Sequence, residues 1–290
     1  MKHKGKIIEG SLVDCVKCGF IHQLSFIEQD YSDDYFTKVK PNFIKEHEAD
    51  KQWYNKIVFK DIFDTVESYL DTRQRRVLDV GAGWMGFLRY AGSHGWDTVG
   101  LDPSLQAYKA SKEENIPFYR GVYDENCLHL GIFDVINAHE VLEHINSPAD
   151  FVKQAHKQLE ENGIFVVTTP NDFNIFQTHR MEMDKNINYG TYYISREHIN
   201  YFTIESLSNL LKNAGFELLE VRTRFPMEMF LFMGIDYTSN SRTGRRVHGY
   251  RKRWELNLEK AGLSSLRKEF DQFWTDRGLG RDIVIYARKV

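Results

Sequence analysis

The stretch Val77–Gly86, which reads Val-Leu-Asp-Val-Gly-Ala-Gly-Trp-Met-Gly, most constrains how this chain can fold. Its apolar start predicts a buried strand, and its glycines predict a tight turn that leads into a helix. Gly81, Gly83 and Gly86 allow the backbone to turn sharply and to approach a ligand closely. We therefore expect a ligand-binding turn at the end of this strand.

Asp79 distinguishes between the two ligands that suit this spacing. The run Gly81-x-Gly83-x-x-Gly86 also matches the dinucleotide fingerprint of oxidoreductases. A carboxylate two residues before the first glycine would repel a pyrophosphate, whereas it would attract the α-ammonium of S-adenosylmethionine. A dinucleotide oxidoreductase is therefore disfavoured. The plain structural alternative is that Asp79 and Asp102 only cap helices.

The next predicted strand, Asp97–Leu101, is followed by a second acid, Asp102. A carboxylate at this position can accept hydrogen bonds from two ribose hydroxyls, which indicates a nucleoside. Backbone or stacking contacts to the adenine are expected after the third strand, and Asn137 should face the reactive end of the cofactor. The predicted cofactor-binding residues are Asp79, Gly81, Ala82, Gly83, Asp102, Pro103, Val122, Tyr123, Asn137 and Tyr35.

Short apolar strands alternate with helical stretches from about residue 76 onward, which predicts an α/β fold with a parallel sheet covered on both faces. The expected strands are 76–80, 97–101, 118–121, 133–138, 163–168, 216–223 and 282–287. The last two are separated by too many residues for a plain loop. We expect an N-terminal cap or lid at 1–75, a cofactor-binding core at 76–224, and a helical insertion with the final strand at 225–290.

Two further segments make this pattern specific. The fourth strand runs into Glu140-Val141-Leu142-Glu143-His144, and Thr169-Pro170-Asn171 follows the fifth. Together with the Asp-Val-Gly-Ala-Gly turn, they resemble the class I S-adenosylmethionine-dependent methyltransferases, strongly over about residues 76–223. The resemblance implies a Rossmann-like, doubly wound, seven-stranded sheet whose last strand is antiparallel, with S-adenosylmethionine as cofactor.

The tail resembles a narrower subset that is associated with sugar and polysaccharide biosynthesis. The residues concerned are 234–237, 249–255 and 278–282. This resemblance implies O-methylation of a sugar or of a nucleotide- or lipid-linked glycan. The alternatives are a small-molecule methyltransferase of quinone or natural-product type, and a catalytically silent relative that binds the cofactor and a partner.

Histidines and acids near the expected strand ends are the candidate catalytic residues. They are His139, His198, Glu140 and His144. A histidine has a pKa suited to general-base catalysis when the acceptor is a hydroxyl. For His144 the structural alternative of capping or packing is favoured, and the pattern does not identify which residue is the base.

Basic and polar residues outside the core are candidates for the acceptor. Arg245 and Arg246 lie in an arginine-rich run that could bind a phosphate bidentately or could form a solvated helix face, and Asn171 follows the fifth strand. Residues 20–60 are expected to close over the cofactor, with Tyr31, Tyr35 and Trp53 as the closing side chains.

Cys15-Val16-Lys17-Cys18 has the spacing of a zinc knuckle, but a structural zinc site needs four ligands. Related sugar C-methyltransferases carry a further cysteine pair upstream, where this chain has His3-Lys4-Gly5-Lys6. His3 or His22 could complete a site, although a turn without metal is the favoured interpretation. The expectation is therefore no metal.

The chain as a whole has the composition of an ordinary globular protein. It has 290 residues, 42% of them hydrophobic, and a formal net charge of −3. This charge gives no reason to expect nucleic acid or a membrane surface as partner, and no apolar run is long enough to span a bilayer. Three cysteines make no disulfide framework, so we expect a cytoplasmic protein. The expected partner is a small-molecule or glycan acceptor, and a homo-oligomer is compatible with the sequence.

Overall fold

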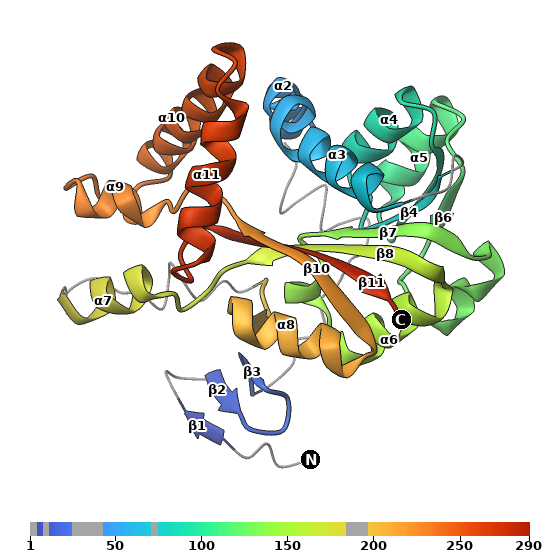
Figure 1. The fold of residues 1–290 in the computed structure, drawn as a ribbon, viewed down its shortest axis with the longest axis horizontal. Coiled ribbons are helices and arrows are strands. Elements are labelled where there is room, and N and C mark those ends of the chain that lie inside the picture. The colour runs from blue at the N-terminus through green and yellow to red at the C-terminus, as the bar shows by residue number, and fades with distance from the viewer. Residues whose placement is uncertain (1–4, 8–11, 25–42, 71–74, 184–196) are drawn as a thin grey trace.

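The computed structural model describes residues 5–7, 12–24, 43–70, 75–183 and 197–290, and is built around a seven-stranded sheet (Figure 1). The strand order is β10-β11-β8-β7-β4-β5-β6. The strands are β4 (Arg76–Val80), β5 (Asp97–Asp102), β6 (Phe118–Arg120), β7 (Phe133–His139), β8 (Leu159–Pro170), β10 (Phe216–Thr223) and β11 (Asp282–Lys289). The prediction of seven strands in a doubly wound α/β fold is confirmed.

The direction of β11 also agrees with the expectation. Strands β4 to β8 pair in parallel, whereas β11 is antiparallel to both of its neighbours, β8 and β10. Parallel strands end at the same edge of the sheet, so the loops after β4, β5 and β7 meet there.

Successive residues of the central strands face opposite sides of the sheet, because the side-chain period of a strand is two. Val77 and Val135 pack in one hydrophobic cluster, whereas Leu78 and Ile136 pack in another. Both faces are thus buried, which explains why these strands read as continuous apolar runs.

Helices cover both faces. On one side lie α1 (Phe43–Ala49), α2 (Lys51–Trp53), the π-helix η2 (Tyr54–Phe59), α3 (Lys60–Tyr69), α4 (Gly86–Ser93) and α5 (Leu105–Glu113). On the other lie α6 (Pro148–Gln158) and α8 (Ile204–Asn213) (Figure 1). Between strands and helices come the 3-10 helices η3 (Glu125–Leu130) and η4 (Leu142–His144), and α7 (Ile175–Met183) follows β8. Among the described residues, no helix combines the length and apolarity needed to cross a membrane.

A second, four-stranded sheet was not expected from the sequence. It contains β1 (Gly5–Ile7), β2 (Leu12–Cys15), β3 (Phe20–Gln23) and β9 (Asn200–Tyr201). Phe20 packs in the cluster formed by α6 and α8, on the face opposite α3. Within the expected cap, segments 12–24 and 43–70 therefore lie on opposite faces of the central sheet (Figure 1).

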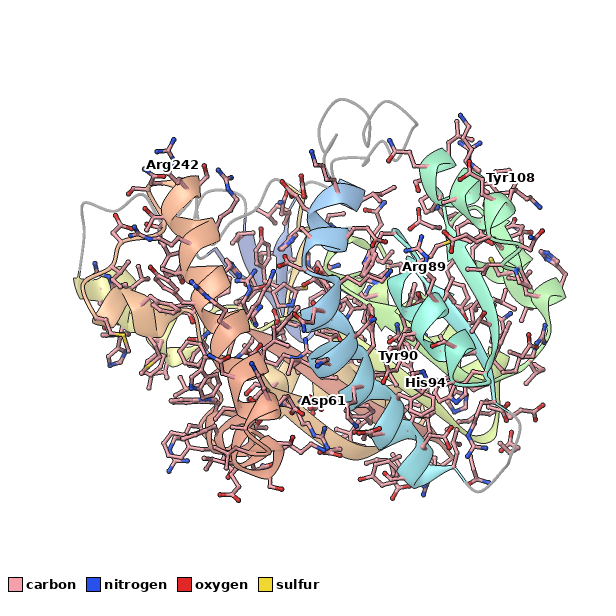
Figure 2. The ribbon with its side chains drawn as sticks, turned by 90° about the horizontal axis from the view of Figure 1, so that it is seen from above. Asp61, Arg89, Tyr90, His94, Tyr108 and Arg242 are labelled. Atoms are coloured by element: carbon pink, nitrogen blue, oxygen red, sulfur yellow. The ribbon has the colours of Figure 1, made fainter. Side chains whose placement is uncertain are left out.

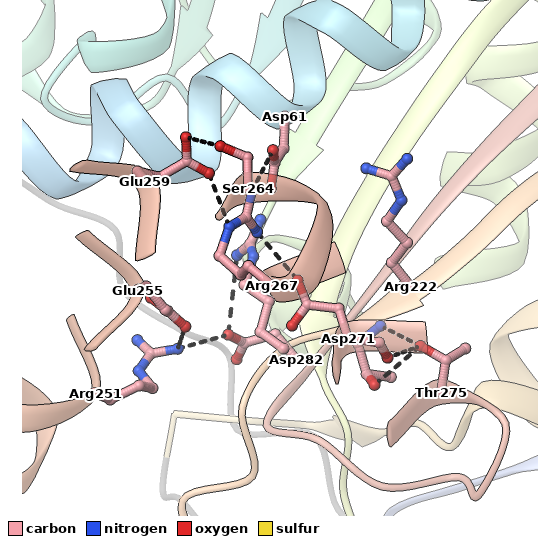
Figure 3. A network of polar contacts seen from close by, with 12 residues as sticks. Asp61, Arg222, Arg251, Glu255, Glu259, Ser264, Arg267, Asp271, Thr275 and Asp282 are labelled. Carbon is pink, nitrogen blue, oxygen red and sulfur yellow. Dashed lines mark hydrogen bonds and ion pairs between the residues drawn. The ribbon is translucent and has the colours of Figure 1, made fainter. Parts of the chain in front are cut away.

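The long insertion before the last strand is helical, as expected. It contains α9 (Glu228–Phe232), α10 (Ser241–Lys260) and α11 (Ser264–Thr275). A buried ion pair attaches it to α3, because the Arg267 guanidinium contacts Asp61 at 2.7 Å (Figure 3). Within the insertion, Arg267 also contacts Asp271 and Glu259 at 3.1 Å each. Figure 2 shows Asp61 on the side of α3 that faces α10 of the insertion.

Candidate functional site

A cavity lies at the carboxyl ends of β4, β5 and β7, where a doubly wound sheet binds its ligands. Its space, including the part open to solvent, is about 1330 Å³. It is lined by Asp79, Gly81, Ala82, Gly83, Asp102, Pro103, Val122, Tyr123 and Asn137. These are nine of the ten predicted cofactor residues, and the tenth, Tyr35, lies outside the described residues, as does Tyr31. Their role in binding remains a prediction.

The glycine turn has a conformation that other residues would strain. Gly81 has φ +73°, and its N–H donates to the carbonyl oxygen of Leu101 at 2.8 Å. A Cβ atom at Gly81 would lie 2.5 Å from Cγ2 of Val141. The turn therefore requires glycine for its backbone angle and for the close approach of β7's exit loop.

The carboxylate of Asp102 is fixed by the backbone on both sides. Gly83 N–H donates to Oδ2 at 3.0 Å, and Ser104 N–H donates to Oδ1 at 2.8 Å. Burial raises the pKa of Asp102, and the two N–H groups partly offset that rise. The carboxylate is thus presented to the cavity in one orientation, as a ribose-binding group requires.

Asp79 lies at the floor of the same cavity and is almost fully buried. Its Oδ1 accepts a hydrogen bond from Nδ2 of Asn137 at 2.6 Å. Burial raises the pKa of Asp79 to about 7, with a smaller contribution from the negative charge of Asp102. A cationic ligand group beside Asp79 would favour its ionised form.

Four aromatic side chains, two of them from η2, form another wall of the cavity that the sequence pattern does not predict. In a π-helix the hydrogen bonds run from i to i+5, and Tyr54 and Phe59 are five residues apart, with ring centroids 5.4 Å apart. His47 stacks on Tyr54 at 5.5 Å, and Trp84 lies 5.4 Å from Tyr54. All four side chains line the cavity. The sequence pattern gives no signal for this wall, since periodicity does not reveal a local π-helix.

His139 and Glu140 stand where β7 leaves the sheet. Both line the cavity, and Glu140 has φ +56°, a strained angle for a residue with a side chain. Burial lowers the pKa of His139, with Arg224 and His47 acting in the same direction and Glu140 and Asp282 opposing. The histidine is therefore neutral at pH 7.

Glu140 is exposed and lines the open cavity. Desolvation opposes its ionisation, but electrostatic coupling to His139, Arg281, His47 and His198 outweighs desolvation and lowers the pKa of Glu140 to about 2. The cavity therefore contains a permanent negative charge at this end.

Three further groups adjoin the cavity behind Glu140. His144 lines it, and the His144 and His198 rings lie 5.0 Å apart, although His198 is not part of the lining. Glu143 is 1% exposed, and burial together with the Glu140 charge raises its pKa well above the ordinary value. Burial and the nearby His144 lower the pKa of His198 to about 4. All four predicted catalytic residues thus lie at one end of the site.

The predicted acceptor residues lie elsewhere. Arg245 and Arg246 are exposed on the first turns of α10, the helix whose start is marked by Arg242 in Figure 2, and they do not line the cavity. Asn171 is buried and donates to the carbonyl oxygens of Gly278 at 3.1 Å and Gly280 at 3.0 Å, so it holds the loop before β11.

Contrary to expectation, Trp53 does not line or close the cavity. Its Nε1–H donates to Glu255 of α10, and the Arg251 guanidinium lies 4.9 Å above its ring. The neighbouring Tyr54 reaches the cavity instead. This happens because α10 from the insertion offers a polar partner to the indole.

The Cys15–Cys18 turn brings a third possible ligand close. Ligand atoms of Cys15, Cys18 and His22 all lie within 4.8 Å of one another. No fourth histidine, cysteine or acid joins this group among the described residues, which do not include His3.

A family model described as a methyltransferase domain matches residues 54–221. Among curated proteins, the ubiquinone biosynthesis O-methyltransferase of Azorhizobium caulinodans is 29% identical over 102 residues, which are 33% of this chain and 40% of that protein. The enzyme of the same name from Psychrobacter cryohalolentis is 30% identical over 106 residues, 33% of this chain and 41% of that protein. The chain thus matches about two fifths of these relatives' length.

Solved structures share the fold over most of the chain. A plantazolicin methyltransferase, solved with SAH and a triazolic desmethylPZN analogue, has a TM-score of 0.55 at 15% identity; the match covers 89% of this chain and 93% of that one. A SAM-dependent methyltransferase from Archaeoglobus fulgidus has a TM-score of 0.51 at 16% identity and covers 81% and 94%. At such identities the likeness concerns the fold.

Proposed function

Because this chain belongs to the methyltransferase-domain family, we propose that it transfers the methyl group of S-adenosylmethionine to a hydroxyl oxygen of a small molecule. It is an S-adenosylmethionine-dependent methyltransferase. The observation that carries the proposal is the pair of buried acids, Asp79 and Asp102, at adjacent strand ends in one cavity. The two acids match the two polar ends of the cofactor, its ammonium and its ribose.

The cofactor lies along the glycine turn in this proposal. Asp102 accepts hydrogen bonds from the ribose hydroxyls, because its two oxygens are already oriented by backbone N–H groups. Asp79 faces the α-ammonium, and Val122 and Tyr123 contact the adenine. The sulfonium then points toward the end of the cavity that carries His139 and Glu140.

Methyl transfer from a sulfonium is an in-line displacement, so the protein must align the acceptor oxygen with the methyl carbon. The O–C bond forms as the S–C bond breaks, and S-adenosylhomocysteine leaves as a neutral thioether. The hydroxyl proton passes to a base. His139 is the proposed base since its lowered pKa keeps it neutral at pH 7, and the Glu140 charge stabilises the protonated imidazole.

The acceptor class has two candidates. A phenolic, quinone-type acceptor comes first because both curated relatives are named for ubiquinone biosynthesis. A sugar hydroxyl comes second, favoured by the resemblance of the tail. A phosphate on a nucleotide-linked sugar would need a basic group nearby, and Arg245 and Arg246 lie outside the cavity lining.

Calorimetry with S-adenosylhomocysteine and with NAD tests the cofactor assignment. We expect binding of the first and none of the second, and the reverse result would contradict the proposal. A methyl-transfer assay across catechols, hydroquinones and sugars then tests the activity. Binding of the cofactor without transfer to any acceptor would identify a catalytically silent relative instead.

A further inference from the structure

Glu143, His144 and His198 bring three possible metal-ligand atoms together beside the acceptor end of the cavity. One atom from each side chain lies within 4.8 Å of the others. Glu143 and His144 are adjacent on η4, whereas His198 comes from a segment more than fifty residues later. Two imidazoles and one carboxylate are a donor set that divalent first-row transition metals favour.

Hydrogen bonds orient the Glu143–His144 pair so that the potential ligand atoms face each other. His144 Nδ1 is 2.8 Å from the carbonyl oxygen of Glu197, so Nδ1–H donates there and Nε2 carries the lone pair. That Nε2 lies 4.0 Å from Oε1 of Glu143, while Thr169 donates to Oε2 at 3.2 Å. Such outer contacts are what hold metal-binding histidines and carboxylates in place.

The His198 segment is attached to the same point by its backbone. Ile199 N–H donates to the carbonyl oxygen of Glu143 at 2.7 Å, and Gln23 donates to the carbonyl oxygen of His198 at 2.7 Å. The second sheet therefore helps to set the position of His198, since Gln23 ends β3. The three side chains are thus held together before any ligand binds.

The buried carboxylate of Glu143 would be stabilised by a nearby positive charge. Glu143 is 1% exposed, and among the described residues its one ion-pair partner is His144, with no lysine or arginine in that role. A buried carboxylate is costly unless a cation neutralises it. A divalent cation would supply that charge and would also attract Glu140, whose carboxylate shares the cavity.

We infer that Glu143, His144 and His198 bind a divalent transition-metal cation whose open coordination positions face the acceptor. The inference rests on the proposed function only for the cation's role, which is to bind the acceptor oxygen and favour its ionisation. Vicinal oxygens, as in a catechol or a sugar diol, would chelate such a cation. The Cys15–Cys18–His22 group is a different cluster of possible ligands, and its thiolates would favour zinc.

Titration with MnCl₂, followed by calorimetry and electron paramagnetic resonance, tests the site directly in the full-length protein. We expect saturable binding of Mn²⁺ that His198→Ala and His144→Gln each weaken by more than about 100-fold, beyond the loss from altering an outer contact. His129→Gln, which removes an exposed histidine on η3, and the paired Cys15→Ser and Cys18→Ser change should leave it unaltered.

Affinity for S-adenosylhomocysteine, measured on the same variants, shows that they are folded and reports separately on the proposed function. Loss of Mn²⁺ binding with retained cofactor binding supports the metal site. The inference is overturned if the wild-type protein binds no Mn²⁺ up to about 1 mM, where even weak protein sites are filled, or if the two histidine variants bind it as the wild type does.

Discussion

Substitution of Arg267 would test whether the helical insertion is an integral part of the core. The side chain is 2% exposed and contacts three carboxylates, of which Asp61 belongs to α3 and the others to the insertion itself. Arg267→Met keeps most of the volume and removes the charge. Breaking a buried ion pair by removing one partner typically costs about 3–5 kcal/mol, because the opposite charge stays buried.

That loss corresponds to a large shift in thermal unfolding. A change of 1 kcal/mol moves the midpoint by about 2–4 °C in domains of this size class, so we expect the midpoint to fall by roughly 6–20 °C. Scanning calorimetry and urea unfolding measure the two quantities. Arg253→Met, at an exposed position on α10, is the matched control and should change stability by no more than about 0.5 kcal/mol.

The loss should also depend on pH. Burial raises the pKa of Asp271 to about 7 even though Arg267 lowers it, so the pKa of Asp271 should rise further in the variant. A folded-state pKa above the unfolded one stabilises the protein at low pH, and this contribution disappears as the pH rises through the folded value. The deficit of Arg267→Met should therefore be smaller at pH 5 than at pH 8. A deficit equal to that of Arg253→Met at both pH values would refute the argument.

Three other predictions concern the cavity. Asp102→Asn should weaken S-adenosylhomocysteine binding by about 1.5–3 kcal/mol, since a hydrogen bond to a charged group is lost; calorimetry measures this, and unchanged affinity would remove the ribose assignment. Gly81→Ala should abolish cofactor binding because its Cβ would meet Val141, whereas Gly95→Ala, at φ +88° with no atom within 4 Å, carries the backbone strain alone and should bind normally. If His139 is the base, the acidic limb of the pH profile of kcat/KM lies below the usual histidine pKa of about 6.5, because the pKa of the folded-state imidazole is lowered and its neutral form persists to lower pH. An acidic limb at or above that value, or wild-type turnover in His139→Ala, would show that another group accepts the proton.

The local sequence was enough to predict the central sheet and one half of the site. Strand period, the glycine turn and the acid after the second strand are short-range features, so Asp79, Asp102 and Asn137 could be assigned to the strand ends. Because parallel strands end at the same edge of the sheet, these residues could also be predicted to share one cavity.

Contacts between distant segments were decided only by the tertiary structure. β3 pairs with β9, about 180 residues later. β3 has four residues and β9 has two, so neither strand is long enough for its periodicity to predict the pairing. The π-helix turns Tyr54 and Phe59 toward the cavity by a shift of a single hydrogen-bond register, which leaves no trace in an apolar stripe.

The insertion shows the same division most clearly. Its arginine-rich run was visible in the sequence, where it predicted either a phosphate-binding group or a solvated helix face. Arg251 and Arg267 are buried against acids in the core and insertion, whereas Arg245 and Arg246, a few residues away on the same helix as Arg251, face solvent. A helix exposes some positions and buries others according to what packs on it, and that depends on α3, α2 and β11, which the chain brings to α10 only when it folds.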